Sequence, residues 1–200
     1  MMKDEAMSKR ISVKERVLRL AKNKFLRHGF YKVSMDHLVK ELRTSKSSLY
    51  NHFDSKEALV KAVIDQLNAE INQQLEKILD DDKLTFKGKL ITISAFTKKL
   101  LTEVSEEFLH DLEVNTPDIW DYYQHARKQR INKYYKRLFE MGIRAGVVRS
   151  DINLELILSV YLSLTEIPLR VEHTDQLEMD PAKIYEDITE IFLNGIIARD

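Results

Sequence analysis

Residues 44–53 read Thr44-Ser45-Lys46-Ser47-Ser48-Leu49-Tyr50-Asn51-His52-Phe53. We expect a short helix from Lys46 to Phe53, in which Leu49 and Phe53, four positions apart, share one face and point into a core. The remaining side chains are hydrogen-bond donors, and such a set suits contacts to phosphate oxygens and base edges. The alternative interpretation is a polar helix face that is only solvated.

The preceding residues predict two more helices. Ser34 is a good N-cap for a short helix from Met35 to Leu42, and a break follows at Arg43 to Ser45. A longer helix runs from about Ser12 to His28, with Gly29 placed to end it as a left-handed C-cap. Two short helices joined by a tight turn behind a longer supporting helix predict a helix-turn-helix motif, whose second short helix enters the major groove.

The rest of the chain also has helical spacing of apolar residues, and only five Gly and three Pro interrupt it. Asp54 and Glu57 have the spacing of a capping box that opens a fourth helix reaching about Leu79. Asp180 before Pro181 marks the start of the last helix. We expect five helices beyond the fourth, at Phe86 to Val104, Glu106 to Asn115, Asp118 to Met141, Leu154 to Leu169 and Pro181 to Ala198.

The predicted fold class is therefore all-α. Residues 1–62 form an N-terminal three-helix helix-turn-helix DNA-binding domain, and residues 63–200 form a C-terminal helical ligand-binding and dimerisation domain. Formal charge supports this division: residues 1–62 hold 15 Lys or Arg and 7 Asp or Glu, a balance of +8, whereas the rest hold 17 and 25, a balance of −8. A basic first domain on an acidic second one indicates a polyanionic partner, because cations near phosphates release condensed counterions.

Composition narrows the function further. Cysteine is absent, which excludes disulfides, thiolate nucleophiles and Cys-based zinc sites. We find no nucleophile motif, no Gly-rich phosphate loop and no metal-ligand set; His110 with Glu113 is interpreted as a surface pair. The sequence thus predicts no enzyme, no metal and no cofactor. No apolar stretch is long enough to span a bilayer and no signal-like segment begins the chain, so we expect no membrane partner and a cytoplasmic location.

Residues 13–64 resemble the DNA-binding region of the TetR family. The resemblance rests on Phe25 with Gly29-Phe30, on Ser34-Met35, on Leu49-Tyr50-Asn51-His52-Phe53, and on Ser55-Lys56-Glu57-Ala58-Leu59. It implies a two-domain homodimer, usually a repressor, that binds double-stranded operator DNA. It places Tyr50, His52 and Lys56 at phosphate contacts, Lys46, Ser47, Ser48 and Asn51 nearer the bases, and Ser34 and Met35 close to the DNA backbone. Thr44 and Ser45 complete the predicted DNA-binding set.

Two positions depart from that family's pattern. Arg43 stands in the turn where Gly is usual, and Gly adopts a positive φ at little cost. We therefore expect Arg43 to have a strained backbone or a different turn, and to contact a phosphate if its side chain points outward. Ser47 stands where Gly or Pro is frequent, which is a mild change.

Two apolar stripes in the last helices predict a dimer interface. They would pair with their twofold copies as a four-helix interface, in which Gly195 allows close approach. The alternative is that both stripes face the subunit's own core, although two DNA half-sites require two copies of the chain. The predicted interface residues are Leu154, Leu158, Tyr161, Ile184, Ile188, Ile191 and Gly195.

The segment from Phe86 to Met141 is rich in aromatic residues that either line an effector cavity or fill the core. Our cavity candidates are Phe96, Leu100, Trp120, Tyr123 and Tyr134, and they would suit a small apolar or aromatic effector. The resulting hypothesis is a regulator released from its operator by that effector. The alternative is a DNA-binding dimer with no small ligand, either constitutive or controlled by a protein partner.

Overall fold

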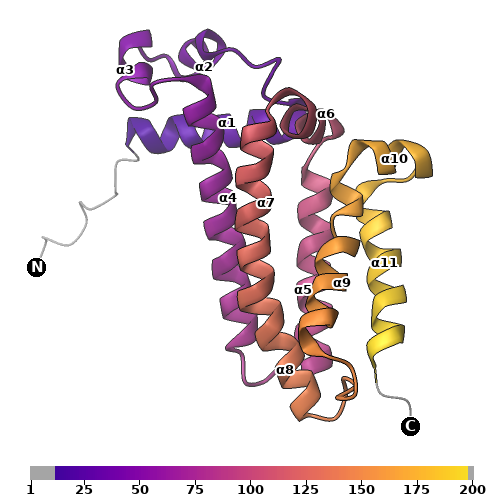
Figure 1. Ribbon diagram of the computed structural model, residues 1–200. Coiled ribbons are helices and arrows are strands. Elements are labelled where there is room, and N and C mark those ends of the chain that lie inside the picture. The colour runs from indigo at the N-terminus through magenta and orange to yellow at the C-terminus, as the bar shows by residue number, and fades with distance from the viewer. Residues whose placement is uncertain (1–11, 198–200) are drawn as a thin grey trace, which may run out of the picture.

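The computed structural model describes residues 12–197 and is helical almost throughout (Figure 1). Three helices make up the N-terminal unit, which we call the head (residues 12–62); the remaining described residues are called the body. The head contains α1 (Val13–His28), α2 (Met35–Leu42) and α3 (Lys46–Tyr50), and α4 (Lys56–Leu79) begins in it. The all-α fold expected from the sequence is confirmed.

The body is a bundle of long helices that run beside α4 (Figure 1). Two of its turns are π-helical, η1 and η2, and one, η3, is 3-10. The elements in order are α5 (Phe86–Glu103), α6 (Glu106–His110), η1 (Asp111–Asn115), α7 (Pro117–Arg130), η2 (Ile131–Tyr135), α8 (Lys136–Arg144), α9 (Leu154–Leu164), η3 (Ile167–Leu169), α10 (Val171–Leu177) and α11 (Pro181–Ile196).

Local capping signals explain where most helices begin. The Ser34 hydroxyl accepts a hydrogen bond from the backbone N–H of His37 at 3.1 Å, as expected for the N-cap of α2. Asp180 accepts from the N–H groups of Ala182 and Lys183, and Pro181 occupies the first position of α11. Both predicted helix starts are therefore confirmed.

Four predicted boundaries need correction. The capping box at Asp54 and Glu57 is wrong, because Ser55 caps α4 and accepts from the N–H of Ala58 at 3.1 Å. Helix α3 ends at Tyr50 rather than Phe53, although the N–H of Phe53 still donates to the Leu49 carbonyl at 3.1 Å. Gly29 has the expected positive φ of 71°, but its ψ of 154° is extended rather than left-handed helical.

The fourth correction concerns α9. The helix predicted from Leu154 to Leu169 ends at Leu164, because Pro168 cannot continue the α-helical hydrogen-bond ladder; η3 and the unpredicted helix α10 follow. The predicted end of the last helix, Ala198, lies outside the described residues.

Helix α4 connects the head to the body. Its first turns bury Leu59, Val60 and Val63 in an apolar core that the head shares with the adjoining end of the body, and its last turns bury Ile78 and Leu79 in a second apolar core at the far end of the bundle. A single helix of 24 residues therefore links the two units without a flexible tether. The predicted boundary between residues 62 and 63 falls inside this helix and stays a prediction.

A buried lysine closes the C-terminal end of α4. The Lys89 side chain from α5 is only 2% exposed, and its ammonium donates to the carbonyls of Ile78, Leu79 and Asp81 at 3.1, 2.9 and 2.5 Å. A cation at a helix C-terminus satisfies orphan carbonyls and complements the helix dipole. This interaction anchors the α4–α5 turn.

Candidate functional site

The outer face of α3 carries the sequence-predicted DNA contacts. Leu49 and Phe53 are buried as expected, and Ser45 caps the helix by accepting from the N–H of Ser48 at 3.1 Å. Most of the predicted set is exposed on the head: Ser34, Arg43, Ser45, Lys46, Ser47, Tyr50, Asn51 and His52. Thr44, Ser48 and Lys56 are half-buried. The exposed members lie on α3, in the segments on either side of it and at the N-cap of α2, so they form a group of hydrogen-bond donors on the head.

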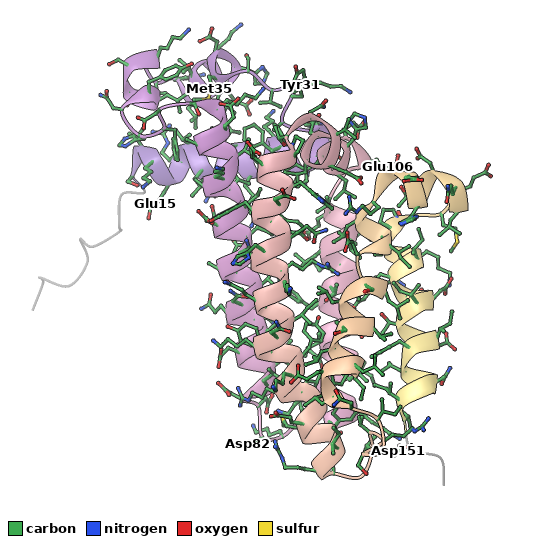
Figure 2. All side chains as sticks on the ribbon, in the orientation of Figure 1. Glu15, Tyr31, Met35, Asp82, Glu106 and Asp151 are labelled. Carbon is green, nitrogen blue, oxygen red and sulfur yellow. The ribbon has the colours of Figure 1, made fainter. Side chains whose placement is uncertain are left out.

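Met35 is the one predicted contact whose side chain is buried, and it packs in the core of the head. The backbone N–H of Met35 lies in the first turn of α2, where N–H groups have no carbonyl partner within the helix. This N–H is therefore the group of Met35 that can donate to a phosphate. Figure 2 shows Met35 at the end of the molecule that α2 and α3 form. Its predicted role is therefore restricted to the main chain.

Arg43 adopts a left-handed backbone conformation, which is the first of the two outcomes expected for an arginine at a position where Gly is usual. Its φ is 51° and its ψ is 44°, and its backbone N–H donates to the carbonyls of Lys40 and Val39. The turn thus keeps the geometry that Gly would give, at a conformational cost carried by an arginine. The exposed side chain remains available for a phosphate.

Two of the basic residues are held by neighbours within the head. The Lys46 ammonium pairs with Asp36 at 2.9 Å, and this pairing raises the pKa of Lys46. The Lys56 ammonium donates to the carbonyl of Tyr31 at 3.0 Å and lies 5.7 Å from the centre of its ring. Desolvation lowers the pKa of Lys56 despite nearby Asp111. Lys56 therefore positions the α1–α2 loop in addition to its predicted phosphate contact.

The head is joined to the body through the α6–η1 segment. The carboxylate of Asp111 accepts from the N–H of Tyr31 at 2.7 Å, and the N–H of Ser105 donates to the Leu26 carbonyl at 2.7 Å. Gly29 permits this approach, because a Cβ there would lie 2.6 Å from the Asp111 carboxylate. Figure 2 shows Tyr31 and Glu106 at this junction.

A largely apolar cavity of about 160 Å³ lies in the body directly below the junction. Helices α4 and α5 contribute to its wall, as do the α6–η1 and α7–η2 segments. Of the five predicted cavity residues, Leu100 and Tyr123 line it. Phe96 borders a separate shallow groove, Trp120 packs against Tyr123 and Arg170, and Tyr134 is buried in the second core.

Sequence analysis missed the polar residues of this cavity. Arg127 and Arg130 are buried in its wall, and so are the tyrosines Tyr135, Tyr161 and Tyr185. The signal present in the sequence was the spacing of Arg127, Arg130 and Ile131, which places two cations on the same inward stripe as an apolar residue. In a helix with many charged residues, arginines are ordinarily assigned to the solvent-exposed face, and these two were therefore overlooked.

The predicted dimer residues divide into two sets. Leu158, Tyr161 and Ile184 are buried within the subunit, whereas Ile191 and Gly195 are exposed and Leu154 and Ile188 are half-buried. The exposed apolar surface of these helices is formed by Leu156 and Val160 on α9 and by Ile191 on α11. The exposed apolar face of α9 therefore lies on a different side of the helix from the predicted interface residues. On α11, Ile191 belongs to both the predicted and the exposed set.

Other predicted features can be placed briefly. His110 is exposed, and Glu113 pairs with Arg170 at 2.9 Å rather than with His110. Residues 12–197 contain no cluster of three or more His, Cys, Asp or Glu residues suited to a metal ion. Over the same residues, none of the helices has the length and apolar character required to cross a membrane.

The protruding α3, the short helix behind it and the tight turn between them define a helix-turn-helix DNA-binding protein. A family profile described as "Bacterial regulatory proteins, tetR family" matches residues 17–63. The chain is 25% identical over 169 residues to the HTH-type transcriptional regulator UidR of Escherichia coli, covering 82% of this chain and 83% of the relative. The chain therefore carries a TetR-type DNA-binding region at residues 17–63 and is similar over most of its length to an HTH-type transcriptional regulator.

Solved structures share the fold over nearly the full length. SmeT, described as the repressor of the Stenotrophomonas maltophilia multidrug efflux pump SmeDEF, has a TM-score of 0.71 at 14% identity, with 94% of this chain and 91% of SmeT covered. A putative regulator from Saccharomonospora viridis in complex with choline has a TM-score of 0.70 at 15% identity, with 93% of this chain and 98% of that protein covered. At such identities the likeness shows the fold alone.

Proposed function

We propose that this chain is a homodimeric repressor that binds operator DNA through α3 and leaves it when a small molecule occupies the cavity. In this proposal residues 1–62 are the DNA-binding domain and residues 63–200 sense the effector and dimerise. Repression by SmeT and the choline complex of the Saccharomonospora viridis protein are precedents within the same fold.

The observation that carries the proposal is the position of the cavity. Ile64 and Leu67 of α4 line it, and both belong to the same apolar core as the residues of α4 that pack in the head. Phe108 and Leu112 line it from the α6–η1 segment, which also holds Asp111 against Tyr31. A ligand in the cavity would therefore contact both structural links to the head. A shift of a few kcal/mol between two states is enough to change DNA affinity.

The alternative is a DNA-binding dimer without a small ligand. The cavity favours the first function, because an apolar space adjoining the head offers a small molecule a place to bind. A dimer itself follows from the need to place two copies of α3 about 34 Å apart on successive turns of DNA. The exposed residues Leu156, Val160 and Ile191 are the surface that we propose for pairing.

DNA binding is tested by titrating the purified chain against its own upstream intergenic DNA at several salt concentrations. Lys46→Ala should weaken binding and reduce the slope of log affinity against log salt by about 1, because one cation is removed from the DNA-binding face and fewer counterions are released. Tyr50→Ala should weaken binding as well. Lys128→Ala removes the same charge from an exposed position in the body and should leave both quantities unchanged.

Binding neither to that DNA nor to any fragment of a random genomic library would refute the proposal. Repression is measured separately by in vitro transcription from the bound promoter, and an increase in transcript would refute the repressor role. Leu156→Glu should convert the dimer to a monomer in sedimentation velocity, since the exposed apolar stripe would gain a charge. A monomeric wild-type chain would contradict the dimer.

A further inference from the structure

Two arginine side chains are buried in the cavity wall with only neutral partners. Arg127 is 5% exposed, and its guanidinium donates to the Leu162 carbonyl at 2.8 Å, the Thr165 hydroxyl at 2.6 Å and the Gln124 amide oxygen at 3.2 Å. Arg130 is 9% exposed, and its guanidinium donates to the amide oxygen of Asn68 at 2.7 Å. Each guanidinium has five N–H donors, so both retain donors without a protein acceptor among residues 12–197.

No carboxylate in the described part of the chain forms an ion pair with either arginine. Glu166 attracts Arg127 electrostatically, but its carboxylate is committed to Arg170 at 2.6 Å. Glu70 also lines the cavity and pairs with Lys22. Because arginine stays protonated at neutral pH, the wall carries two buried positive charges that lack a counter-charge. Such an arrangement is unfavourable unless an anion completes it.

Three phenol groups add further donors to the same cavity. The hydroxyl oxygens of Tyr161 and Tyr185 lie 3.4 Å apart, and the rings of Tyr135 and Tyr161 have centres 4.6 Å apart. Burial raises the pKa of both Tyr135 and Tyr161, which keeps these groups protonated as donors. The N–H groups of a guanidinium and the O–H group of a phenol can all donate hydrogen bonds to a carboxylate.

The rest of the cavity suits a small apolar group. Leu67, Leu100, Leu101, Phe108 and Leu112 are among its lining residues. Its volume of about 160 Å³ is close to the roughly 150 Å³ of an engineered apolar cavity that admits benzene. The space therefore fits a single aromatic ring or a short acyl chain.

We propose that the effector is a small organic acid whose carboxylate binds at Arg127 and Arg130 and whose single ring or short acyl chain fills the apolar part of the cavity. This inference rests on the proposed function, because it names the chemical class of the effector. It also sets this chain apart from the choline-binding relative, whose ligand is a cation.

The test compares acids with neutral molecules of the same shape. Phenylacetate and hexanoate, their primary amides and choline are titrated into the full-length chain. Binding is followed by fluorescence of Trp120, the single tryptophan, whose ring lies 6.0 Å from that of the cavity residue Tyr123. We expect at least one acid to bind at least about tenfold more tightly than its amide, because a charge-assisted hydrogen bond exceeds a neutral one by that order.

Two variants locate the charge that selects the acid. Arg130→Gln and Arg127→Gln should reduce the ratio of acid to amide affinity towards 1, and the change is read as a ratio so that general loss of stability cancels. Arg137→Gln is the matched control, because Arg137 is an arginine farther along the same run of helix that pairs with Asp80 outside the cavity. It should leave the ratio unchanged.

The inference is overturned if an amide or choline binds as tightly as the acids, if no acid binds to the folded wild-type chain, or if both cavity variants keep the wild-type ratio. Displacement of the operator DNA is measured with the same acids. Arginine-dependent binding of an acid without displacement would leave the anion site standing and refute effector release. Binding of DNA with no binding of any acid would refute only the anion site.

Discussion

Substitution of Gly29 by Ala tests the junction between head and body. Gly29 has φ 71° and ψ 154°, a region that is nearly restricted to glycine and costs another residue about 1–3 kcal/mol. Its added Cβ would lie 2.6 Å from the Asp111 carboxylate, which accepts the N–H of Tyr31. Losing this charged hydrogen bond costs about 1.5–3 kcal/mol. Together the two terms give a destabilisation of about 2.5–6 kcal/mol.

The matched control is Gly146→Ala. Gly146 also has a positive φ, 68°, but a Cβ there would meet nothing within 4 Å. It therefore carries a positive-φ cost without the displaced carboxylate. The Asp111 contact should make Gly29→Ala the more destabilising variant by at least about 1.5 kcal/mol, or at least about 3 °C in melting temperature for a chain of this size. Thermal unfolding by circular dichroism measures both variants.

A double-mutant cycle then identifies the carboxylate as the cause. In an Asp111→Ala background the carboxylate contact is absent, so the cost of Gly29→Ala should fall by about 1.5–3 kcal/mol. The cost that remains comes from the positive φ and from the Glu107 carbonyl oxygen, which would lie 3.2 Å from the added Cβ. Equal melting temperatures for Gly29→Ala and Gly146→Ala in the wild-type background would refute the reasoning. An undiminished cost of Gly29→Ala in the Asp111→Ala background would show that another contact is responsible.

Three further predictions concern the remaining strained and buried groups. Lys89→Met should destabilise the chain by about 3–5 kcal/mol in urea unfolding, because buried carbonyls at the end of α4 lose their donor. The control Lys87→Met, at an exposed position, should change stability by less than about 0.5 kcal/mol. Similar effects of the two substitutions would contradict the capping role of Lys89. Arg43→Gly should stabilise the chain by about 1 kcal/mol, because Gly adopts the positive φ of this turn without strain. It should also lower the slope of log DNA affinity against log salt by about 1. An unchanged slope would exclude the phosphate contact of Arg43. Since burial raises the pKa of Tyr135 and Tyr161, the unfolded chain loses phenolic protons first, and stability should fall as pH rises above about 10. Tyr135→Phe should flatten this fall in urea titrations between about pH 8 and pH 11, and a parallel curve would contradict it.

The head was predictable because its signals are local. Ser34 and Ser45 precede their helices by one residue, and the apolar pair Leu49 and Phe53 fixes the inward face of the recognition segment. The left-handed turn at Arg43 was anticipated from the usual presence of Gly there. The capping box predicted at Asp54 was wrong because the hydroxyl of Ser55, one residue later, accepts the N–H of Ala58 and caps the helix instead.

The body was less predictable because several of its helices are covered on more than one side. In such helices an apolar stripe does not indicate whether it faces the core, the cavity or a second subunit, so Leu158 and Ile184 were assigned to an interface although the subunit buries them. Arg127 and Arg130 were overlooked for a related reason. Charged residues are almost never buried without a charged partner, and only the three-dimensional structure shows that these two are.

The two π-helical segments suggest how the cavity would communicate with the DNA-binding face. Each π turn inserts an extra residue into a helix and changes the direction of the side chains around it. In η1, adjacent residues contact different units, since Leu112 lines the cavity and Asp111 binds the N–H of Tyr31. In η2, Ile131 and Tyr135 line the cavity immediately after Arg130. A ligand held by the two arginines would lie against both turns, because Leu112 of η1 and Tyr135 of η2 line the same cavity. The hydrogen bond at Asp111 is worth about 1.5–3 kcal/mol, which is the order of free energy that shifts a two-state equilibrium about tenfold or more. The loss of this one contact therefore has a magnitude sufficient for the release that we propose.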